Sequence, residues 1–434
     1  MSLKSNFSYL LFSMFTILVI TTICSAQATS LLWSSNLTET DQDSHDTGGG
    51  HSLVFLAISD DGKTIATATA DGVIYLINDA ETIFRNEPSV NKTSEILSLS
   101  LSPDGNYLAF SDAGSSPASN PPKRISLLNK NGEELWTHST RTFVFHSAVS
   151  SNGLFSVFGS YENITAVDRN GSILWNHPVA SPVISLDISD DGEYIVAATE
   201  GGEVLSLNQS GFVLWENQFR SPYDIIISSD GNYVCLTTYL RKVFFMDNRG
   251  SILWNRTLPQ DTKFAECGIS YNGEKIVVRT TGAVSGYDRS GLPMWNYSTD
   301  YQQPLTHPIS APVFLLSEDG RYSVVAAGDS IIILDDKGNE TGTSSFNDEI
   351  SGVAISSDGT KIATITLNEL YYFDNPDAGS GDSPTSSSGA GQTGDQENET
   401  SPVTQTKQSP LSFFIIISGT VIAIIIMRFH RISF

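Results

Sequence analysis

The chain has 434 residues, enough for two or three average domains or for one large β architecture. Its 24 Lys and Arg residues are outnumbered by 48 Asp and Glu, and the formal net charge of −24 excludes the cationic surface that a nucleic-acid binder needs. Charged residues make up only 17% of the chain and 34 residues are glycine, which favours strands and turns over long salt-bridged helices. We therefore expect an all-β protein.

The first 28 residues have the three-part pattern of a secretory signal peptide. Lys4 precedes an apolar run from Tyr9 to Cys24, and the small residues Ala26 and Ala28 follow. Cleavage after Ala26 or Ala28 would leave an exported mature chain. The alternative is an uncleaved anchor helix, although the run is shorter than the ~20 apolar residues that span a bilayer.

The segment after the signal peptide is built from a repeat. One copy predicts four strands at 183–188, 194–199, 203–208 and 211–215, separated by three turns. The first turn of each copy carries Asp-Gly or Asn-Gly, because a tight hairpin turn needs positive φ angles that Gly and Asn tolerate. Its glycine recurs eight times, with a mean spacing of about 42 residues. That spacing is the period of a four-stranded propeller blade.

A tryptophan recurs at one place in the repeat. Five copies have a glycine in the turn before the fourth strand, and a Trp follows four residues later, at Trp136, Trp175, Trp215, Trp254 and Trp295. A large flat ring at the same position in successive blades is expected to pack between neighbouring sheets. The alternative is an aromatic box for a ligand.

The last copy lacks a fourth strand, and a matching strand lies at the other end of the chain. Residues 350–374 supply only three strands, whereas Leu31-Leu-Trp33 matches Ile173-Leu-Trp175, the fourth strand of an earlier copy. Joining this N-terminal strand to the last blade would close the ring and remove its open edge. We therefore predict one eight-bladed β-propeller over residues 29–375, closed by an N-terminal strand and with Trp33 in the last blade.

The copies that end in Asp168-Arg-Asn-Gly-Ser-Ile-Leu-Trp175 and Asp247-Asn-Arg-Gly-Ser-Ile-Leu-Trp254 resemble the Trp-docking repeats of PQQ-binding-like (quinoprotein-type) propellers. The turn in Ser102-Pro-Asp-Gly-Asn-Tyr-Leu-Ala-Phe110 is similar to that of WD40-like propellers. The resemblance covers residues 31–374 and implies the fold, in a surface-anchored prokaryotic member, which we expect to be archaeal. Both families include enzymes and scaffolds, so it implies no single function. The spacing between Asp and Gly is one residue shorter than in quinoproteins and no Thr precedes the Gly, so cofactor binding does not carry over.

The C-terminal part predicts a tether. Residues 376–410 are rich in Gly, Ser, Thr and Pro with almost no apolar side chain, which indicates a disordered stalk. Residues 411–427 carry no charge and suit a transmembrane helix, and the basic tail at 428–434 favours a cytoplasmic C-terminus with an extracellular propeller. A sorting signal that is cut off and replaced by a lipid is the alternative.

Outside the signal peptide the chain has two cysteines, Cys235 and Cys267. They could form one bridge. They lie in strand patterns of different repeats, however, and we expect them to be buried free thiols.

Three long connections predict a binding face. The spacing from Trp33 to Gly62 is 29 residues and from Trp295 to Gly320 is 25, against 17 from Trp136 to Gly153, and the second copy holds a further insertion near 111–123. All three fall on the face opposite the tight turns, and rigid scaffolds usually carry function on loops. Tolerated loop growth is the alternative. The candidate binding residues are Asp41, His45, His51, Lys123, Tyr297, Tyr301 and His307.

We assign no catalytic residue, metal or cofactor from the sequence. The seven histidines are scattered without metal-ligand spacing, and the Asp-Asp-Gly sequences at 60–62 and 190–192 are explained by turn chemistry better than by calcium. Nine sequons permit surface glycosylation of an exported chain, at Asn36, Asn91, Asn163, Asn170, Asn208, Asn255, Asn296, Asn339 and Asn398.

These features favour a non-enzymatic, single-pass cell-surface propeller that binds a protein or glycan partner in the envelope or outside the cell. The alternative is an exported quinoprotein-like oxidoreductase with a cofactor in the propeller channel. A third possibility is an envelope assembly scaffold that resembles the outer-membrane lipoprotein propellers, but the transmembrane tail argues against it.

Overall fold

A computed structural model describes residues 27–37, 53–69, 72–78, 81–85, 94–114, 122–299, 314–375 and 377–378. Apart from Asp377 and Ala378, the predicted stalk lies outside these residues, as do the predicted transmembrane helix, the basic tail and residues 1–26 of the predicted signal peptide. Within the described ranges, no helix has the length and apolar character needed to cross a membrane.

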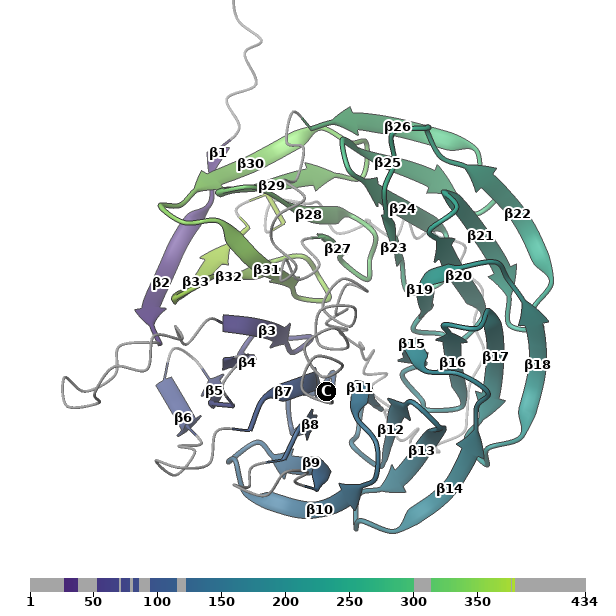
Figure 1. Ribbon diagram of the computed structural model, residues 1–434. Helices are drawn as coiled ribbons and strands as arrows, with labels where there is room; N and C mark the ends of the chain where they lie inside the picture. The colour runs from purple at the N-terminus through teal and green to yellow at the C-terminus, as the bar shows by residue number, and fades with distance from the viewer. Residues whose placement is uncertain are drawn as a thin grey trace, which may run out of the picture.

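The described residues form eight sheets arranged in a ring, the blades of a propeller (Figure 1). Blades 1 to 4 comprise β3 (Leu53–Ile58), β4 (Thr64–Thr69), β5 (Ile74–Asn78) and β6 (Glu81–Arg85); β7 (Ile96–Leu101), β8 (Tyr107–Asp112), β9 (Lys123–Asn129) and β10 (Glu134–Thr140); β11 (Val144–Val149), β12 (Phe155–Ser160), β13 (Asn163–Asp168) and β14 (Ile173–Pro178); and β15 (Val183–Ile188), β16 (Tyr194–Thr199), β17 (Glu203–Asn208) and β18 (Val213–Gln218).

Blades 5 to 8 comprise β19 (Pro222–Ile227), β20 (Tyr233–Thr238), β21 (Lys242–Asp247) and β22 (Ile252–Thr257); β23 (Ala265–Ile269), β24 (Lys275–Thr280), β25 (Ala283–Asp288) and β26 (Pro293–Ser298); β27 (Phe314–Leu316), β28 (Tyr322–Ala327), β29 (Ser330–Asp335) and β30 (Glu340–Ser345); and β31 (Ile350–Ile355), β32 (Lys361–Thr366) and β33 (Glu369–Asp374) with β2 (Ser30–Asn36). The predicted eight-bladed, all-β propeller is confirmed.

The N-terminal strand closes the ring as predicted. β2 pairs antiparallel with β33, with Trp33 opposite Tyr372, and Figure 1 shows the two strands side by side in blade 8. The rings of Trp33 and Tyr372 lie 5.4 Å apart, and the Tyr372 hydroxyl donates to the Gly62 carbonyl of blade 1 at 2.7 Å. Just before β2, the two-residue strand β1 (Gln27–Ala28) pairs parallel with β30 at the outer edge of blade 7.

One turn chemistry recurs in all eight blades between the first and second strands. The sequence there is Ser-x-Asp/Asn-Gly, and every glycine has a positive φ. In blade 4 the Ser189 hydroxyl donates to Asp191 Oδ1 at 2.7 Å and accepts from the backbone N–H of Tyr194 at 3.0 Å. Because Gly192 has a φ of 74°, a residue with a Cβ would be strained there. The turn is therefore fixed by three residues that the sequence repeats.

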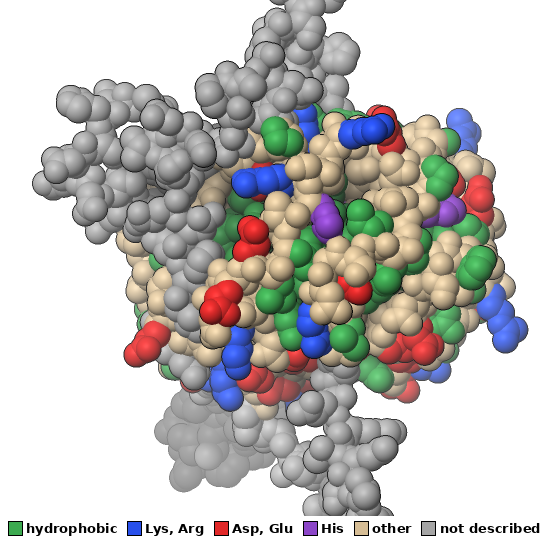
Figure 2. Space-filling view, turned by 90° about the horizontal axis from the view of Figure 1, so that it is seen from below, with side chains coloured by type: hydrophobic (Ala, Val, Ile, Leu, Met, Phe, Trp, Pro, Cys, Tyr) green, Lys and Arg blue, Asp and Glu red, His purple; other side chains and the backbone are tan. Residues whose placement is uncertain are grey.

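Successive connections of an antiparallel blade alternate between the two faces of the ring. We call the side with the Ser-x-Asp/Asn-Gly turns the turn face, and the side with the connections between second and third strands and between blades the loop face. The hydrophobic core lies between blades, so the inner strands are almost fully buried. Along outer strands such as β14, exposed residues alternate with partly buried ones after the first position. Apolar side chains such as Ile173 and Leu174 remain about half exposed there. Figure 2 shows hydrophobic side chains at the edge of the ring among polar ones.

Candidate functional site

The recurring tryptophans join neighbouring blades. The Trp215 ring in blade 4 lies under the turn of blade 5, where a Cβ on Gly250 would come within 2.7 Å of the ring, and its indole N–H donates to the Asn248 carbonyl at 3.0 Å. The contact recurs for Trp175, Trp254 and Trp295.

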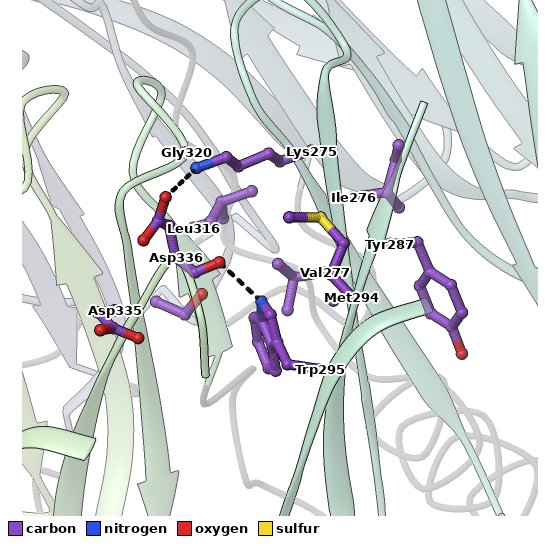
Figure 3. A pocket seen from close by; sticks show the side chains of 12 residues that line it. Lys275, Ile276, Val277, Tyr287, Met294, Trp295, Leu316, Gly320, Asp335 and Asp336 are labelled. Atoms are coloured by element: carbon purple, nitrogen blue, oxygen red, sulfur yellow. Dashed lines mark hydrogen bonds and ion pairs between the residues drawn. The ribbon is translucent and has the colours of Figure 1, made fainter. Parts of the chain in front are cut away.

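The pocket in Figure 3 is the junction of this kind between blades 6 and 7. The Trp295 indole N–H donates to the Asp336 carbonyl at 3.0 Å, and Lys275 Nζ lies 2.8 Å from the Asp336 carboxylate. Because the Trp295 indole fills the space between the two blades, we assign these residues a packing role and not a role in binding a ligand.

Of the predicted loop residues, the structure describes Lys123 and Tyr297. Asp41, His45, His51, Tyr301 and His307 lie outside the described residues.

Of the remaining candidates, Lys123 is the first residue of β9; it is 8% exposed, and its ammonium lies 4.8 Å from the centre of the Phe143 ring. Tyr297 lies within β26, and its hydroxyl donates to Glu340 Oε2 at 2.7 Å in blade 7. Both residues therefore belong to strands, because the strands continue past the point where the sequence suggested that the loops begin.

The three long connections nevertheless leave the ring on one face. Their described ends are Leu37 and Leu53, Gly114 and Pro122, and Thr299 and Phe314. The first and third join neighbouring blades and the second joins β8 to β9, so all of them belong to the loop face.

Aromatic side chains gather on that face in blades 3, 5 and 6. In blade 3, Phe145 lies 5.9 Å from Phe143 and 5.5 Å from Tyr161, measured between ring centres. In blade 5, Tyr223 lies 4.8 Å from Tyr239, and it is 6.4 Å from Phe264 of blade 6. We call this set the aromatic crescent: Phe143, Phe145, Tyr161, Tyr223, Tyr239 and Phe264.

The exposed carboxylate of Glu200 in blade 4 acts electrostatically on a tyrosine in each half of the crescent. Burial and the charge of Glu200 together raise the pKa of Tyr161 and also that of Tyr239, which places Glu200 near both phenols. Tyr239 is 46% exposed and Leu240 is 47% exposed, whereas Tyr223 beneath them is buried. The crescent thus offers one exposed ring, Tyr239, and the partly exposed rings of Phe143, Tyr161 and Phe264 on a buried base, with the charge of Glu200 nearby.

The sequence carries a signal for the crescent that loop lengths do not reveal. Tyr161, Glu200 and Tyr239 each follow the last residue of a second strand, so they occupy one position in three successive repeats. Aligning the repeats on their turn glycines would have placed these three residues next to one another on the loop face.

The centre of the turn face is closed by a ring of backbone hydrogen bonds. In six of the eight blades the second residue of the Ser-x-Asp/Asn-Gly turn donates its N–H to the turn of the next blade, for example from Asp190 to the Ser229 carbonyl at 3.1 Å. In blade 5 the third residue, Asp230, donates instead, to the Tyr271 carbonyl at 3.2 Å. Pro103 has no N–H, so it donates no such bond from blade 2 to blade 3. The ring holds the inner ends of the blades together.

Three acidic side chains enter this ring, from Asp60, Asp190 and Glu318. Glu318 accepts hydrogen bonds from the hydroxyls of Ser229 and Ser357, in blades 5 and 8, but no described residue donates one to either oxygen of Asp190. Burial, followed by the charges of Glu318 and Asp60, raises the pKa of Asp190 to about 10, and burial raises that of Glu318 to about 8. At neutral pH both carboxyls are therefore largely protonated.

A second set of buried ionisable side chains lies in blades 4 and 6. Asp187 Oδ2 accepts from the Ile227 backbone N–H at 2.8 Å, across the junction of blades 4 and 5. In blade 6 the buried Arg279 and Glu266 form an ion pair at 3.1 Å. These groups have partners within the core, so we assign them a structural role.

The described residues contain no group of three or more His, Cys, Asp or Glu side chains placed to hold a metal ion. In the two Asp-Asp-Gly turns the second acid accepts the turn's own hydrogen bonds, as Asp61 does from Ser59 at 2.7 Å and from the Lys63 N–H at 3.0 Å. The buried His146 is neutral, because burial lowers its pKa to about 4.

The fold and the blade junctions define a closed eight-bladed propeller of the PQQ-like and WD40-like class. The family model described as "Outer membrane protein assembly factor BamB" matches residues 21–190, 120–261 and 200–359, and together these ranges cover more than half of the chain. The chain therefore belongs to the BamB family.

Solved structures agree on the fold. The crystal structure of BamB from Moraxella catarrhalis aligns with a TM-score of 0.60 and 12% identity, covering 80% of this chain and 100% of that one. The C-terminal WD40 domain of Sif2 aligns with a TM-score of 0.60 and 14% identity, covering 75% of this chain and 96% of that one. No curated protein matches the sequence.

Proposed function

We propose that this protein is an envelope interaction scaffold whose loop face binds a protein partner through the aromatic crescent. The observation that carries the proposal is the coincidence, on one face, of the exposed Tyr239 ring, its partly exposed aromatic neighbours and the described ends of the three long connections. The description of the family model names a protein assembly factor, and this supports a protein as the partner.

The chemistry of the crescent suits a protein partner. Tyr161 and Tyr239 each combine an apolar ring with a hydroxyl, and aromatic residues of this kind supply most of the binding energy at protein interfaces. Glu200 between them would select a basic side chain on the partner. The rings rest on buried neighbours such as Phe145 and Tyr223, so little conformational entropy is lost when a partner binds.

Photo-crosslinking in cells that make the full chain tests the site. A photoreactive phenylalanine analogue replaces Tyr239 on the loop face or, as the matched control, Tyr271 on the turn face, which is 40% exposed. We expect a protein adduct from position 239 and none from position 271. Adducts from position 271 alone would assign binding to the turn face, and a chromophore in the purified chain would favour the quinoprotein-like alternative.

For location, we propose that residues 1–28 direct export and that residues 411–427 anchor the mature chain, with the propeller outside the membrane. The pattern of apolar and basic residues in these two segments supports the proposal. Protease added to intact cells should degrade the propeller while a C-terminal tag stays protected. A propeller that survives until the cells are lysed would contradict this topology.

A further inference from the structure

The two cysteines outside the predicted signal peptide lie against each other across the junction of blades 5 and 6. Cys235 belongs to β20, the second strand of blade 5, and Cys267 belongs to β23, the first strand of blade 6. Both are buried free thiols, at 0% and 5% exposure, and both belong to one hydrophobic cluster between the two blades. Nothing in the repeat requires a cysteine at either position, because the other blades fill the same places with other residues.

A hydrogen bond beside the pair links the two strands. The Thr237 hydroxyl, two residues after Cys235, donates to the carbonyl of Ala265, two residues before Cys267, at 2.7 Å. Ala265 of β23 and Ile276 of β24 pack in the same buried cluster as the two cysteines. Strands β20 and β23 are therefore held side by side at the position of the two thiols.

We propose that Cys235 and Cys267 form a disulfide that links blades 5 and 6 when the protein folds in an oxidising compartment. The two sulfurs form one bond and their two hydrogens leave as protons. The two electrons pass to an external oxidant, a protein or small-molecule disulfide, which takes up two protons and becomes two thiols. The bond would be a covalent link between blades whose described contacts are otherwise non-covalent.

The same surroundings determine when the bond can form. Exchange requires a thiolate and access to the donor, and the folded protein restricts both. Burial, the neighbouring Cys235 thiol and the nearby carboxylates of Asp224 and Glu266 raise the pKa of Cys267. Oxidation therefore takes place before blades 5 and 6 dock, and the folded protein afterwards retains whichever redox state it acquired.

The test compares two ways of making the full chain. Cell-free synthesis in detergent is carried out with either oxidised or reduced glutathione. The products are then denatured and alkylated, and their masses are measured by mass spectrometry. We expect no alkylated cysteine among residues 235 and 267 in the oxidised sample and two in the reduced one. After folding, each sample should resist the opposite reagent until denaturant is added. Two alkylated thiols after folding with oxidised glutathione would overturn the proposal.

Stability supplies a second readout with a matched variant. The oxidised chain should melt roughly 5 °C above the reduced chain, because a cross-link restricts the unfolded state. Cys267→Ala should show the same midpoint in both conditions, and Cys235→Ser serves if that variant does not fold. Equal midpoints for the wild-type chain, despite a measured disulfide, would contradict a link that stabilises the junction. Because these measurements use purified protein, they stand or fall independently of the loop-face partner.

Discussion

Trp215→Ala is expected to lower the free energy of unfolding by about 4 kcal/mol, since it removes a buried ring and leaves a cavity between blades 4 and 5. The indole is 8% exposed, packs under Gly250 and donates a hydrogen bond to the Asn248 carbonyl, so both packing and a polar contact are lost. Urea unfolding followed by circular dichroism measures the change.

The control for this variant is three residues away. Phe212 is also aromatic, but it is 71% exposed, so Phe212→Ala should change stability by about 0.5 kcal/mol or less. If Trp215→Ala does not fold, Trp215→Phe should fold with an intermediate loss. Equal effects of Trp215→Ala and Phe212→Ala would show that the tryptophans do not hold the blades together.

Asp190→Asn is expected to stabilise the protein at pH 8 by on the order of 3 kcal/mol and to leave it nearly unchanged at pH 4. The folded carboxyl has a pKa of about 10, well above the usual value near 4 of an unfolded chain, so the folded state binds the extra proton. The contribution of the protonated Asp190 carboxyl to the free energy of unfolding is fully present below pH 4 and is lost as the pH rises towards 10. Glu318, with a pKa of about 8, adds a loss of the same sign.

Thermal melting between pH 4 and pH 9 measures this effect. The wild-type midpoint should fall as the pH rises, and Asp190→Asn should flatten the curve. Asp191→Asn makes the same substitution one residue away, at a turn position where Asn152 and Asn272 already serve in other blades, so it should keep the wild-type slope. Parallel curves for Asp190→Asn and the wild type would contradict a protonated carboxyl in the turn-face ring.

The blade count, the turn chemistry and the closing strand could be predicted because each is written in local, repeated sequence. Asp-Gly and Asn-Gly mark the first turn of every blade, and the Leu31-Leu-Trp33 motif matches a fourth strand that the last copy lacks. The closure predicted from that match appears as the pairing of β2 with β33.

The crescent and the turn-face ring were harder to predict because their members meet only when the ring closes. Tyr161 and Tyr239 are far apart in the sequence and become neighbours of Glu200 through the geometry of three blades. Asp190 and Glu318 stand at a variable turn position, and nothing local distinguishes them from exposed turn acids. The contact between Cys235 and Cys267 arises in the same way, from two strands of different repeats.

The measurement that tests the account most directly is the affinity of the full chain for the protein crosslinked at position 239, with and without the rings of Tyr161 and Tyr239. Tyr161→Ser with Tyr239→Ser should weaken binding at least tenfold, about 1.4 kcal/mol, whereas Tyr271→Ser with Phe212→Ser, on other surfaces, should leave it within twofold. Undiminished binding by the Tyr161/Tyr239 variant would contradict a binding site on the loop face.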